Sequence, residues 1–533
     1  MSEHRKFRFG VAVHGALLAA GVAAATMVAP PAAAETTLKA VVHADLKILD
    51  PVWTTAFITN RHGYLIYDNL FGLNSKFEPQ PQMVDKWTVS ADKLTYTFTL
   101  RPGMKWHDGM PVTAADCVAS LLRSWKREPM GQRLASFVAS LDVVDASTFR
   151  LTLKEAYGLV LETLGKAATP AFMMPERIAK TDAMTQITEY VGSGPFIFVK
   201  DEWRPGNKVV YRKFADYVPR KEKADYLSGG KVAKVDRLEW LYIPDHNTAL
   251  SALQAGEIDY YEAPPLDFVA VLEKNPKLQV IDIDPLGTQG VLRPNHLYPP
   301  FNNPKARQAL LHIVKQEDYM RAVVGNPRLY RKFCGAYFMC GSDNESDVGA
   351  EPLRKQDFAK AKQLLKEAGY NGEKIVVMQP TDRAQYNAAT MVTIQNLRKA
   401  GVNVDVQAMD WSTLLSRRAK KDPPYEGGYH IFHTTQGGPD TAMPVANTWF
   451  NSRCEKANPG WACDLELDKL VEEWSRESDR TKRKAILERI QKRAYESVPY
   501  VIYGQYTQPI AVRANVKGVL KAGIPIYWNI EKQ

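Results

Sequence analysis

The chain has 533 residues and a formal net charge of +10, and 45% of its residues are hydrophobic while 24% are charged. This length is enough for two or three domains with full cores. Lys and Arg are dispersed among acidic residues, which favours a solvated surface over a nucleic-acid-binding face. Histidine is scarce at 10 residues, and G-x-S-x-G and H-E-x-x-H segments are absent. The sequence therefore argues against a hydrolase, and no catalytic residue, cofactor or resident metal is expected.

The first 34 residues have the pattern of a secretory signal. Arg5, Lys6 and Arg8 form a basic start, and the Ala-rich apolar run 11–29 leads to Ala32-Ala33-Ala34. An A-x-A site of this kind predicts cleavage after Ala34 and export to the periplasm. The alternative is a retained membrane anchor, because the run approaches spanning length. The weak hydrophobicity of alanine and the cleavage site favour the signal.

In chain order, the first half predicts strands and capped helices. Residues 37–42 read as a strand and residues 60–70 as a helix. Leu94, Tyr96, Phe98 and Leu100 alternate with threonines, which is typical of a half-buried strand. Thr113 then caps a helix, and Asp116 completes a capping box. Further along, Gly256 ends a short helix, and Asn303 caps a helix over 305–314 with Pro304 at its first position.

The second half alternates strands with helices. Such alternation predicts parallel strands joined by right-handed crossovers. The predicted strands are 374–378, 402–408 and 428–433, the helices between them are 386–400 and 412–420, and a charged helical region covers 465–497.

Five cysteines are present in a chain predicted to be exported. Cys334 and Cys340 lie close together in the chain, as do Cys454 and Cys463, each pair in a Gly-, Asn- or Pro-containing loop. Two short disulfides are expected in an oxidising compartment, and the spacings do not match a zinc site. Cys117 borders the apolar face of its helix and is expected to be free and buried.

Several motifs resemble those of one family. They are W-x-D-G-x-P-V-T-A-x-D at 106–116, Gly192-Ser193-Gly194-Pro195-Phe196, the run 243–259, and Asn295 to Phe301. Together they resemble the extracellular solute-binding proteins of family 5, which are the dipeptide-, oligopeptide- and nickel-binding receptors of ABC importers. The glycines of the second motif are expected to permit a tight turn.

The resemblance implies an α/β fold of the periplasmic-binding-protein type (cluster C), with two α/β lobes, a hinge and an extra domain. Lobe I is expected from residues 35–71, 206–290 and 508–533, the extra domain from 72–205, and lobe II from 291–507. The implied function is to bind a peptide or peptide-like solute between the lobes and deliver it to a membrane permease. A monomer without nucleic acid is expected. The alternatives are a non-peptide solute, such as an organic acid or a metal chelate, and a receptor that feeds a chemosensor.

The loop 379–386 follows a predicted parallel strand, and ligands bind beyond the carboxyl ends of such strands. Its sequence resembles the family's P-V-T-R-P-Y-N loop, in which the Arg pairs with the carboxylate of a bound dipeptide. Arg383 is accordingly expected to bind an acidic group through two parallel hydrogen bonds. The alternative is a surface ion pair with Asp382.

The loop 434–444 resembles the dipeptide binders' T-G-D-N-G-D-P-D, whose first Asp anchors the α-ammonium of the peptide. Thr435 takes that position here, and only Asp440 remains of the acidic residues, either as a ligand-binding residue or as a cap of the next turn. An ammonium group in a closed cleft needs a paired charge. We therefore expect Thr435 and Gln436 to face a solute that is anionic or neutral at that end.

Other candidate ligand contacts are aromatic or lie on the first lobe. Tyr386 and Trp411 are expected to stack on the solute, with core packing as the alternative, and Thr55 and Phe57 are placed on the cleft wall of lobe I. His430 and His433 lie three apart on one predicted strand and face opposite sides. They are not expected to bind one metal ion.

Overall fold

The computed structural model describes residues 10, 35–477 and 479–533, without the side chains of residues 412, 439 and 440. Residues 1–35 and 36–533 form separate units, and the described helices and strands all lie in the second. The predicted signal and its cleavage site lie outside the described residues, apart from residue 10. Within the described part, no helix combines the length and apolar character needed to span a membrane.

A seven-stranded sheet forms the first core. Its order is β12 (Leu278–Ile281), β18 (Ile510–Arg513), β11 (Tyr260–Tyr261), β1 (Thr37–Val41), β10 (Arg237–Leu241), β9 (Lys208–Lys213) and β8 (Phe196–Phe198). The central strand β1 is parallel to both of its neighbours, β10 and β11. Leu38 and Ala40, on one face of β1, are fully buried, whereas Lys39 between them is exposed on the other face.

A separate antiparallel sheet has the order β4 (Val84–Val89), β5 (Thr95–Leu100), β7 (Thr148–Leu153) and β6 (Val138–Val143). Tyr96, Phe98 and Leu100 of β5 are buried, which confirms the predicted alternation. Helix α2 (Ala114–Trp125) packs on this sheet, and the capping box of Thr113 and Asp116 is present. The neighbouring elements are β2 (Phe71–Leu73), β3 (Pro79–Pro81), α3 (Pro129–Phe137), α4 (Val160–Gly165), α5 (Glu176–Ala179) and the 3₁₀ turn Lys200–Glu202.

A five-stranded sheet forms the second core, with the order β15 (Val404–Met409), β14 (Ile375–Pro380), β16 (Ile431–Gly437), β13 (Thr288–Pro294) and β17 (Val501–Tyr506). Strand β14 is parallel to β15 and β16, as predicted, whereas β13 is antiparallel to β16 and β17. The strand predicted at 428–433 is observed at 431–437, so the prediction began and ended too early. Residues 431–437 all pair with β13, so Thr435 and Gln436 lie in a strand and not in a loop.

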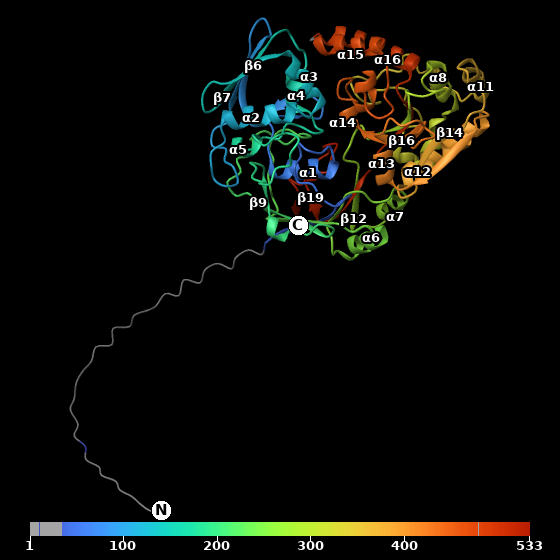
Figure 1. The fold of residues 1–533 in the computed structure, drawn as a ribbon. Helices are drawn as coiled ribbons and strands as arrows, with labels where there is room; N and C mark the ends of the chain where they lie inside the picture. Colours follow the sequence, from blue (N-terminus) through green and yellow to red (C-terminus); the bar gives the residue numbers. More distant parts are fainter. Residues whose placement is uncertain (1–9, 11–34, 478) are drawn as a thin grey trace, which may run out of the picture. The chain divides into compact units, whose positions relative to one another are not determined.

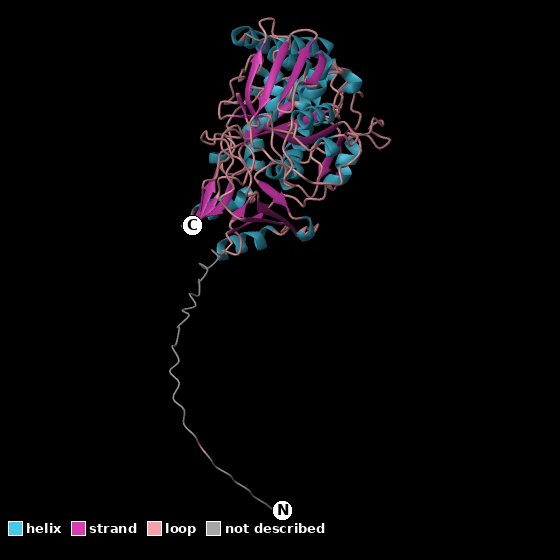
Figure 2. Cartoon of the chain, turned by 90° about the vertical axis from the view of Figure 1, so that its left-hand side faces the viewer, coloured by secondary structure: helices cyan, strands magenta, loops and turns pink. Residues whose placement is uncertain are grey.

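Helices cover both large sheets, and strands and helices alternate through the chain (Figure 1, Figure 2). Helix α1 (Phe57–Ile66) begins and ends earlier than predicted. Asn303 caps α8 (Pro304–Ile313), and Gly256, with φ +85°, ends α6 (His246–Ala255), both as predicted. The remaining elements are α7 (Val269–Glu273), α9 (Gln316–Val323), α10 (Glu351–Arg354), α11 (Phe358–Glu367), α12 (Ala384–Lys399), α13 (Trp411–Arg418), α14 (Gly438–Thr441), α15 (Leu465–Arg476), α16 (Arg480–Ser497), β19 (Val516–Lys517), β20 (Glu531–Lys532) and short 3₁₀ turns.

The glycines at 192 and 194 serve close packing. A Cβ on Gly192 would lie 1.6 Å from the carbonyl oxygen of Ile66, and one on Gly194 would lie 2.7 Å from that of Leu65. The Gly194 amide donates to Ile66 O at 3.0 Å. Glycine is needed here because the segment lies directly against the end of α1, and neither residue has a positive φ.

The structure contains two disulfides, Cys334–Cys340 and Cys454–Cys463, and Cys117 is free and buried. These are the pairings expected from the sequence. Both bridges close short loops beside the five-stranded sheet.

A buried ion pair joins the segment after β1 to α2. Arg123 donates to both carboxylate oxygens of Asp50, at 3.1 and 2.7 Å, and the side chains are 2% and 0% exposed. Arg123 also donates to Thr181 O and Thr185 O, and Asp50 accepts from the Ile187 amide. The pair is thus satisfied on every side, and losing one partner would leave an uncompensated buried charge.

We expect the substitution Asp50→Ala to lower the free energy of unfolding by about 3–5 kcal/mol, because Arg123 would remain buried without its carboxylate. Glu317→Gln, which removes half of the exposed Glu317–Arg321 pair, is the matched control and should cost at most about 1 kcal/mol. Urea denaturation followed by circular dichroism measures both. Equal, small effects of the two substitutions would contradict the structural role of Asp50.

Candidate binding site

The carboxyl ends of β14, β15 and β16 carry the predicted site residues of the five-stranded sheet. Arg383 follows β14 as the N-cap of α12 and is exposed. No ion pair or hydrogen bond of its side chain occurs among the described residues. The alternative pairing with Asp382 is not formed, because Asp382 accepts a hydrogen bond from the Trp411 amide at 2.8 Å. The guanidinium of Arg383 is therefore available to a solute.

Tyr386, Trp411 and Thr435 lie together beside Arg383. The Tyr386 and Trp411 ring centroids are 4.6 Å apart, and the Tyr386 hydroxyl is 3.0 Å from the Thr435 hydroxyl. Arg383 is the N-cap of α12, with an extended backbone, and Tyr386 lies in the first turn of that helix. Three strand ends thus contribute one continuous group of side chains.

Gln436 points away from this group. Successive residues of a strand face opposite sides, and the Gln436 amide nitrogen donates to the Tyr500 hydroxyl at 3.0 Å in a buried network with Gln289 and Asn447. Its Oε1 is buried without a partner. Gln436 therefore does not join the group around Thr435, because the two side chains point to opposite faces of the sheet. The side chain of Asp440 lies outside the described part of the structure.

On the seven-stranded sheet, three charged or polar side chains meet at the carboxyl ends of β1 and β11. His43 follows β1, Glu262 follows β11, and Arg61 reaches them from α1. His43 Nδ1 lies 2.9 Å from Glu262 Oε1, and the His43 amide donates to Glu262 Oε2 at 3.1 Å. Arg61 is ion-paired with Glu262, whose side chain is only 1% exposed. Burial lowers the pKa of Arg61 to about 10.

The sequence did not single out these three residues. Residues 43 and 262 are distant in the chain, and only the parallel pairing of β1 with β11 brings them together. The position of His43 just after the first strand was the available signal. Phe57 is 53% exposed and lies one helical turn before Arg61, on the same face of α1, and Thr55 is exposed nearby in the chain.

Asp45 is a further residue that sequence reasoning missed. It lies two residues after His43, in the segment that follows β1, between Ala44 and Leu46, which pack against the core of the seven-stranded sheet. The Oδ2 atom of Asp45 is buried and has no hydrogen-bond partner. An unpaired buried carboxylate oxygen is costly and needs an explanation.

Electrostatics connect the two groups. The pKa of His43 is held well below its ordinary value, first by burial and then by the positive charges of Arg61 and Arg383. Arg383 belongs to the five-stranded sheet, so its charge reaches a residue at the strand ends of the other sheet. The two sets of carboxyl strand ends therefore face a common region, which is where open α/β sheets bind ligands.

His430 and His433 are occupied by protein partners. His430 accepts from the Val376 amide at 2.9 Å, whereas the His433 ring nitrogens lie 3.0 and 2.7 Å from the hydroxyls of Thr390 and Thr393. Burial lowers the pKa of His433 to about 3. Within the described residues, no group of three potential metal ligands is present.

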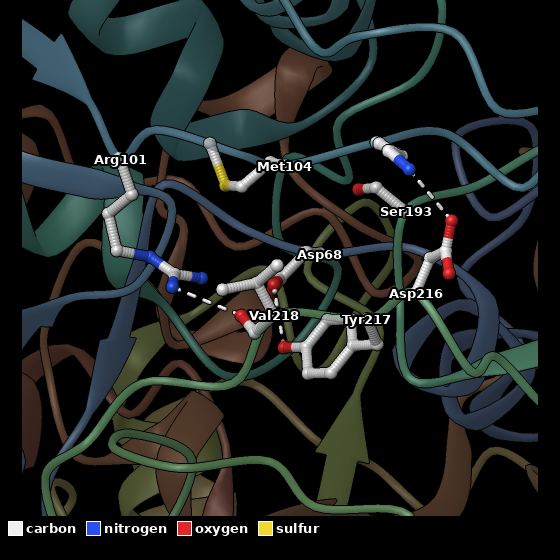
Figure 3. Close-up of a pocket in the computed structure, with 8 residues that line it drawn as sticks. Asp68, Arg101, Met104, Ser193, Asp216, Tyr217 and Val218 are labelled. Carbon is white, nitrogen blue, oxygen red and sulfur yellow. Dashed lines mark hydrogen bonds and ion pairs between the residues drawn. The ribbon is translucent and has the colours of Figure 1, made fainter.

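A small pocket lies elsewhere, beside the buried Asp68 (Figure 3). Its volume is about 10 Å³, enough for about one water molecule. Tyr217 donates to Asp68 at 2.9 Å (Figure 3). Lys105 pairs with Asp216 at 2.8 Å. This pocket is too small for a peptide.

The model of the bacterial extracellular solute-binding proteins, family 5, matches residues 78–458. The chain belongs to this family. A relative from Sinorhizobium fredii, a probable peptide ABC transporter periplasmic-binding protein, is 40% identical over 490 residues, covering 92% of each chain. As a solute-binding protein, the chain is a binding component and not an enzyme.

Two solved structures show the fold. The PBP AgaA of A. tumefaciens R10, in complex with agropinic acid, aligns with a TM-score of 0.78 at 22% identity over 93% of this chain and 99% of that chain. The periplasmic binding protein DppA of Helicobacter pylori, in complex with peptide STSA, aligns with a TM-score of 0.77 at 23% identity over 93% and 98%. The solute-binding protein thus has the periplasmic-binding-protein type of α/β fold that its sequence predicted.

The buried neutral His433 predicts a pH dependence of stability. Its pKa is about 3 in the folded protein and about 6.5 when unfolded, so its contribution is complete above pH 6.5 and is lost as the pH falls toward 3. His433→Gln should therefore reduce the loss of unfolding free energy between pH 7 and pH 5 by about 2 kcal/mol. Denaturant melts at both pH values measure this. An unchanged pH dependence would show that His433 has the same pKa in the folded and unfolded states.

Proposed function

We propose that this chain is the periplasmic receptor of an ABC importer, and that it binds a peptide or peptide-like solute with an acidic group between its two sheets. The observation that carries this proposal is Arg383. Its guanidinium is exposed at the carboxyl end of a parallel strand, has no partner among the described residues, and acts electrostatically on His43 of the other sheet. A carboxylate placed there would accept two parallel hydrogen bonds.

The comparisons support the class of solute. The relative from Sinorhizobium fredii is a probable peptide transporter component, and the protein from Helicobacter pylori is in complex with a peptide. The protein from A. tumefaciens is in complex with an acid, agropinic acid. A non-peptide organic acid is therefore the second candidate, since Arg383 would bind its carboxylate equally well.

The same proposal covers the export of the protein and its docking on the permease. Cleavage after Ala34 releases a monomer that docks transiently on permease subunits. Lobe I consists of the seven-stranded sheet and lobe II of the five-stranded sheet. Because β8 pairs with β9 in the first of these, we place the end of the extra domain near residue 195 in preference to 205. Delivery to a chemosensor is the alternative destination.

We expect Arg383→Ala to weaken solute binding by about 2–5 kcal/mol, or roughly 30-fold or more, because a charged partner is lost from a desolvated site. The probe is a set of synthetic di- and tripeptides, screened by native mass spectrometry and then measured by calorimetry. Arg398→Ala, which removes an exposed charge from the other end of α12, is the matched control and should bind as the parent does.

Two outcomes would count against the proposal. If Arg383→Ala binds as tightly as the parent, the arginine is a surface residue. If no peptide binds and a non-peptide acid co-purifies with the protein, the second candidate replaces the first.

A further inference from the structure

Arg418, the last residue of α13, is a half-buried cation, and one of its side-chain nitrogens is buried without a hydrogen-bond partner. Its Nη1 atom is buried and has no hydrogen-bond partner. Its guanidinium carbon lies 5.8 Å from the Trp411 ring, 5.4 Å from that of Phe432 and 5.3 Å from that of Trp449. Aromatic rings attract a cation but cannot accept its in-plane hydrogen bonds.

A structural arginine in the same part of the fold looks different. Arg293 also lies over the Trp449 ring, at 5.6 Å. It donates to four backbone carbonyls, those of Pro459, Trp449, Pro499 and Asn458, at 2.6–3.3 Å. The fold therefore provides hydrogen-bond acceptors for Arg293, whereas it provides none for the Nη1 atom of Arg418.

The position of Arg418 connects it to the binding site. Residues 411 and 418 are two turns apart on one face of α13, and helical side chains tilt toward the N-terminus of their helix. The guanidinium accordingly reaches back to Trp411, whose ring lies against Tyr386. Burial lowers the pKa of Arg418, and the groups that oppose this shift are the phenols of Tyr429 and Tyr386, so no described carboxylate compensates its charge.

We propose that Arg418 is a second anion-binding residue of the site, and that the solute carries two acidic groups, one for Arg383 and one for Arg418. This inference rests on the proposed binding function and narrows its substrate class. The fit is to a peptide with an acidic side chain or to another dicarboxylic solute. Asp45, which follows β1 of the seven-stranded sheet, has a carboxylate oxygen without a partner. It could pair with one cationic group of the same solute, such as a free amine.

The test uses matched acid and amide probes with the full mature protein. The dipeptides Ala-Glu and Ala-Gln, Glu-Ala and Gln-Ala, and the non-peptide pair glutarate and glutaramate are measured by calorimetry. We expect the acidic member of a bound pair to bind about 10-fold or more tightly, as for a hydrogen-bonded charge. Arg418→Gln should abolish that preference, and Lys420→Gln, which removes a nearby exposed charge, should keep it.

A stability measurement separates binding from folding. Arg418→Gln is expected to leave the Tm of the ligand-free protein unchanged or higher, because it removes a buried nitrogen that has no hydrogen-bond partner. Arg293→Gln should lower the Tm, because it removes hydrogen bonds to four backbone carbonyls. A lower Tm of Arg418→Gln with an unchanged acid preference would show a structural role and overturn the proposal.

The remaining outcomes are also decisive. Equal binding of acid and amide members by the parent overturns the proposal, as does binding of neither acidic peptides nor glutarate. If glutarate binds in an Arg418-dependent way and no dipeptide does, the second anion site stands and the peptide function falls. If peptides bind without acid preference, the peptide function stands and the second anion site falls.

Discussion

In the part of the chain that the structure describes, the backbone passes between the two large sheets twice, and the arrangement of the binding region depends on these two crossings. One crossing, 282–287, links β12 to β13, and the other, 507–509, links β17 to β18. Because β13 and β17 are neighbours in the five-stranded sheet, the crossings enter that sheet side by side. Two adjacent links of this kind have the geometry of a hinge, since few backbone dihedrals must change for one sheet to turn against the other.

This constraint decides where a solute can be held. The seven-stranded and five-stranded sheets have separate core clusters, and the cluster of the five-stranded sheet continues into the four-stranded sheet. The parallel strands of both sheets end on the same region, with His43 and Glu262 on one side and Arg383 and Trp411 on the other. Buried charges away from this region, such as Asp50 with Arg123 and Asp68 with Lys231, are paired and hydrogen-bonded. Near the strand ends, Asp45 Oδ2 is buried without a hydrogen-bond partner, and the side chain of Arg383 has no ion pair or hydrogen bond among the described residues. Both groups could be compensated by a charged solute.

The sequence predicts what depends on local spacing. Thr113 and Asp116 form the predicted capping box, Asn303 and Gly256 mark helix ends as expected, and the disulfides join cysteines that are close in the chain. The extent of β16 was mispredicted because its pairing with β13 is not visible locally. For the same reason Gln436 was assigned to the solute and is instead part of a buried network.

The candidate site follows the same division. Arg383 was singled out because its loop follows a predicted parallel strand and resembles the family's P-V-T-R-P-Y-N loop, and Tyr386 and Trp411 because aromatic rings can stack on a solute. Their roles in binding stay predictions. The group of His43, Arg61 and Glu262 escaped prediction because it is assembled by strand order from residues far apart in sequence, and Arg418 because burial without a partner is a property of the folded chain alone.

Hydrogen exchange of the mature protein, with and without a peptide found by native mass spectrometry, tests the central claim most directly. If the solute lies between the two sets of strand ends, added protection should appear in 42–46, 261–263, 381–387 and 411–418, together on both sheets. Protection on one sheet only, or centred on the pocket beside Asp68, would contradict a site shared by the two lobes.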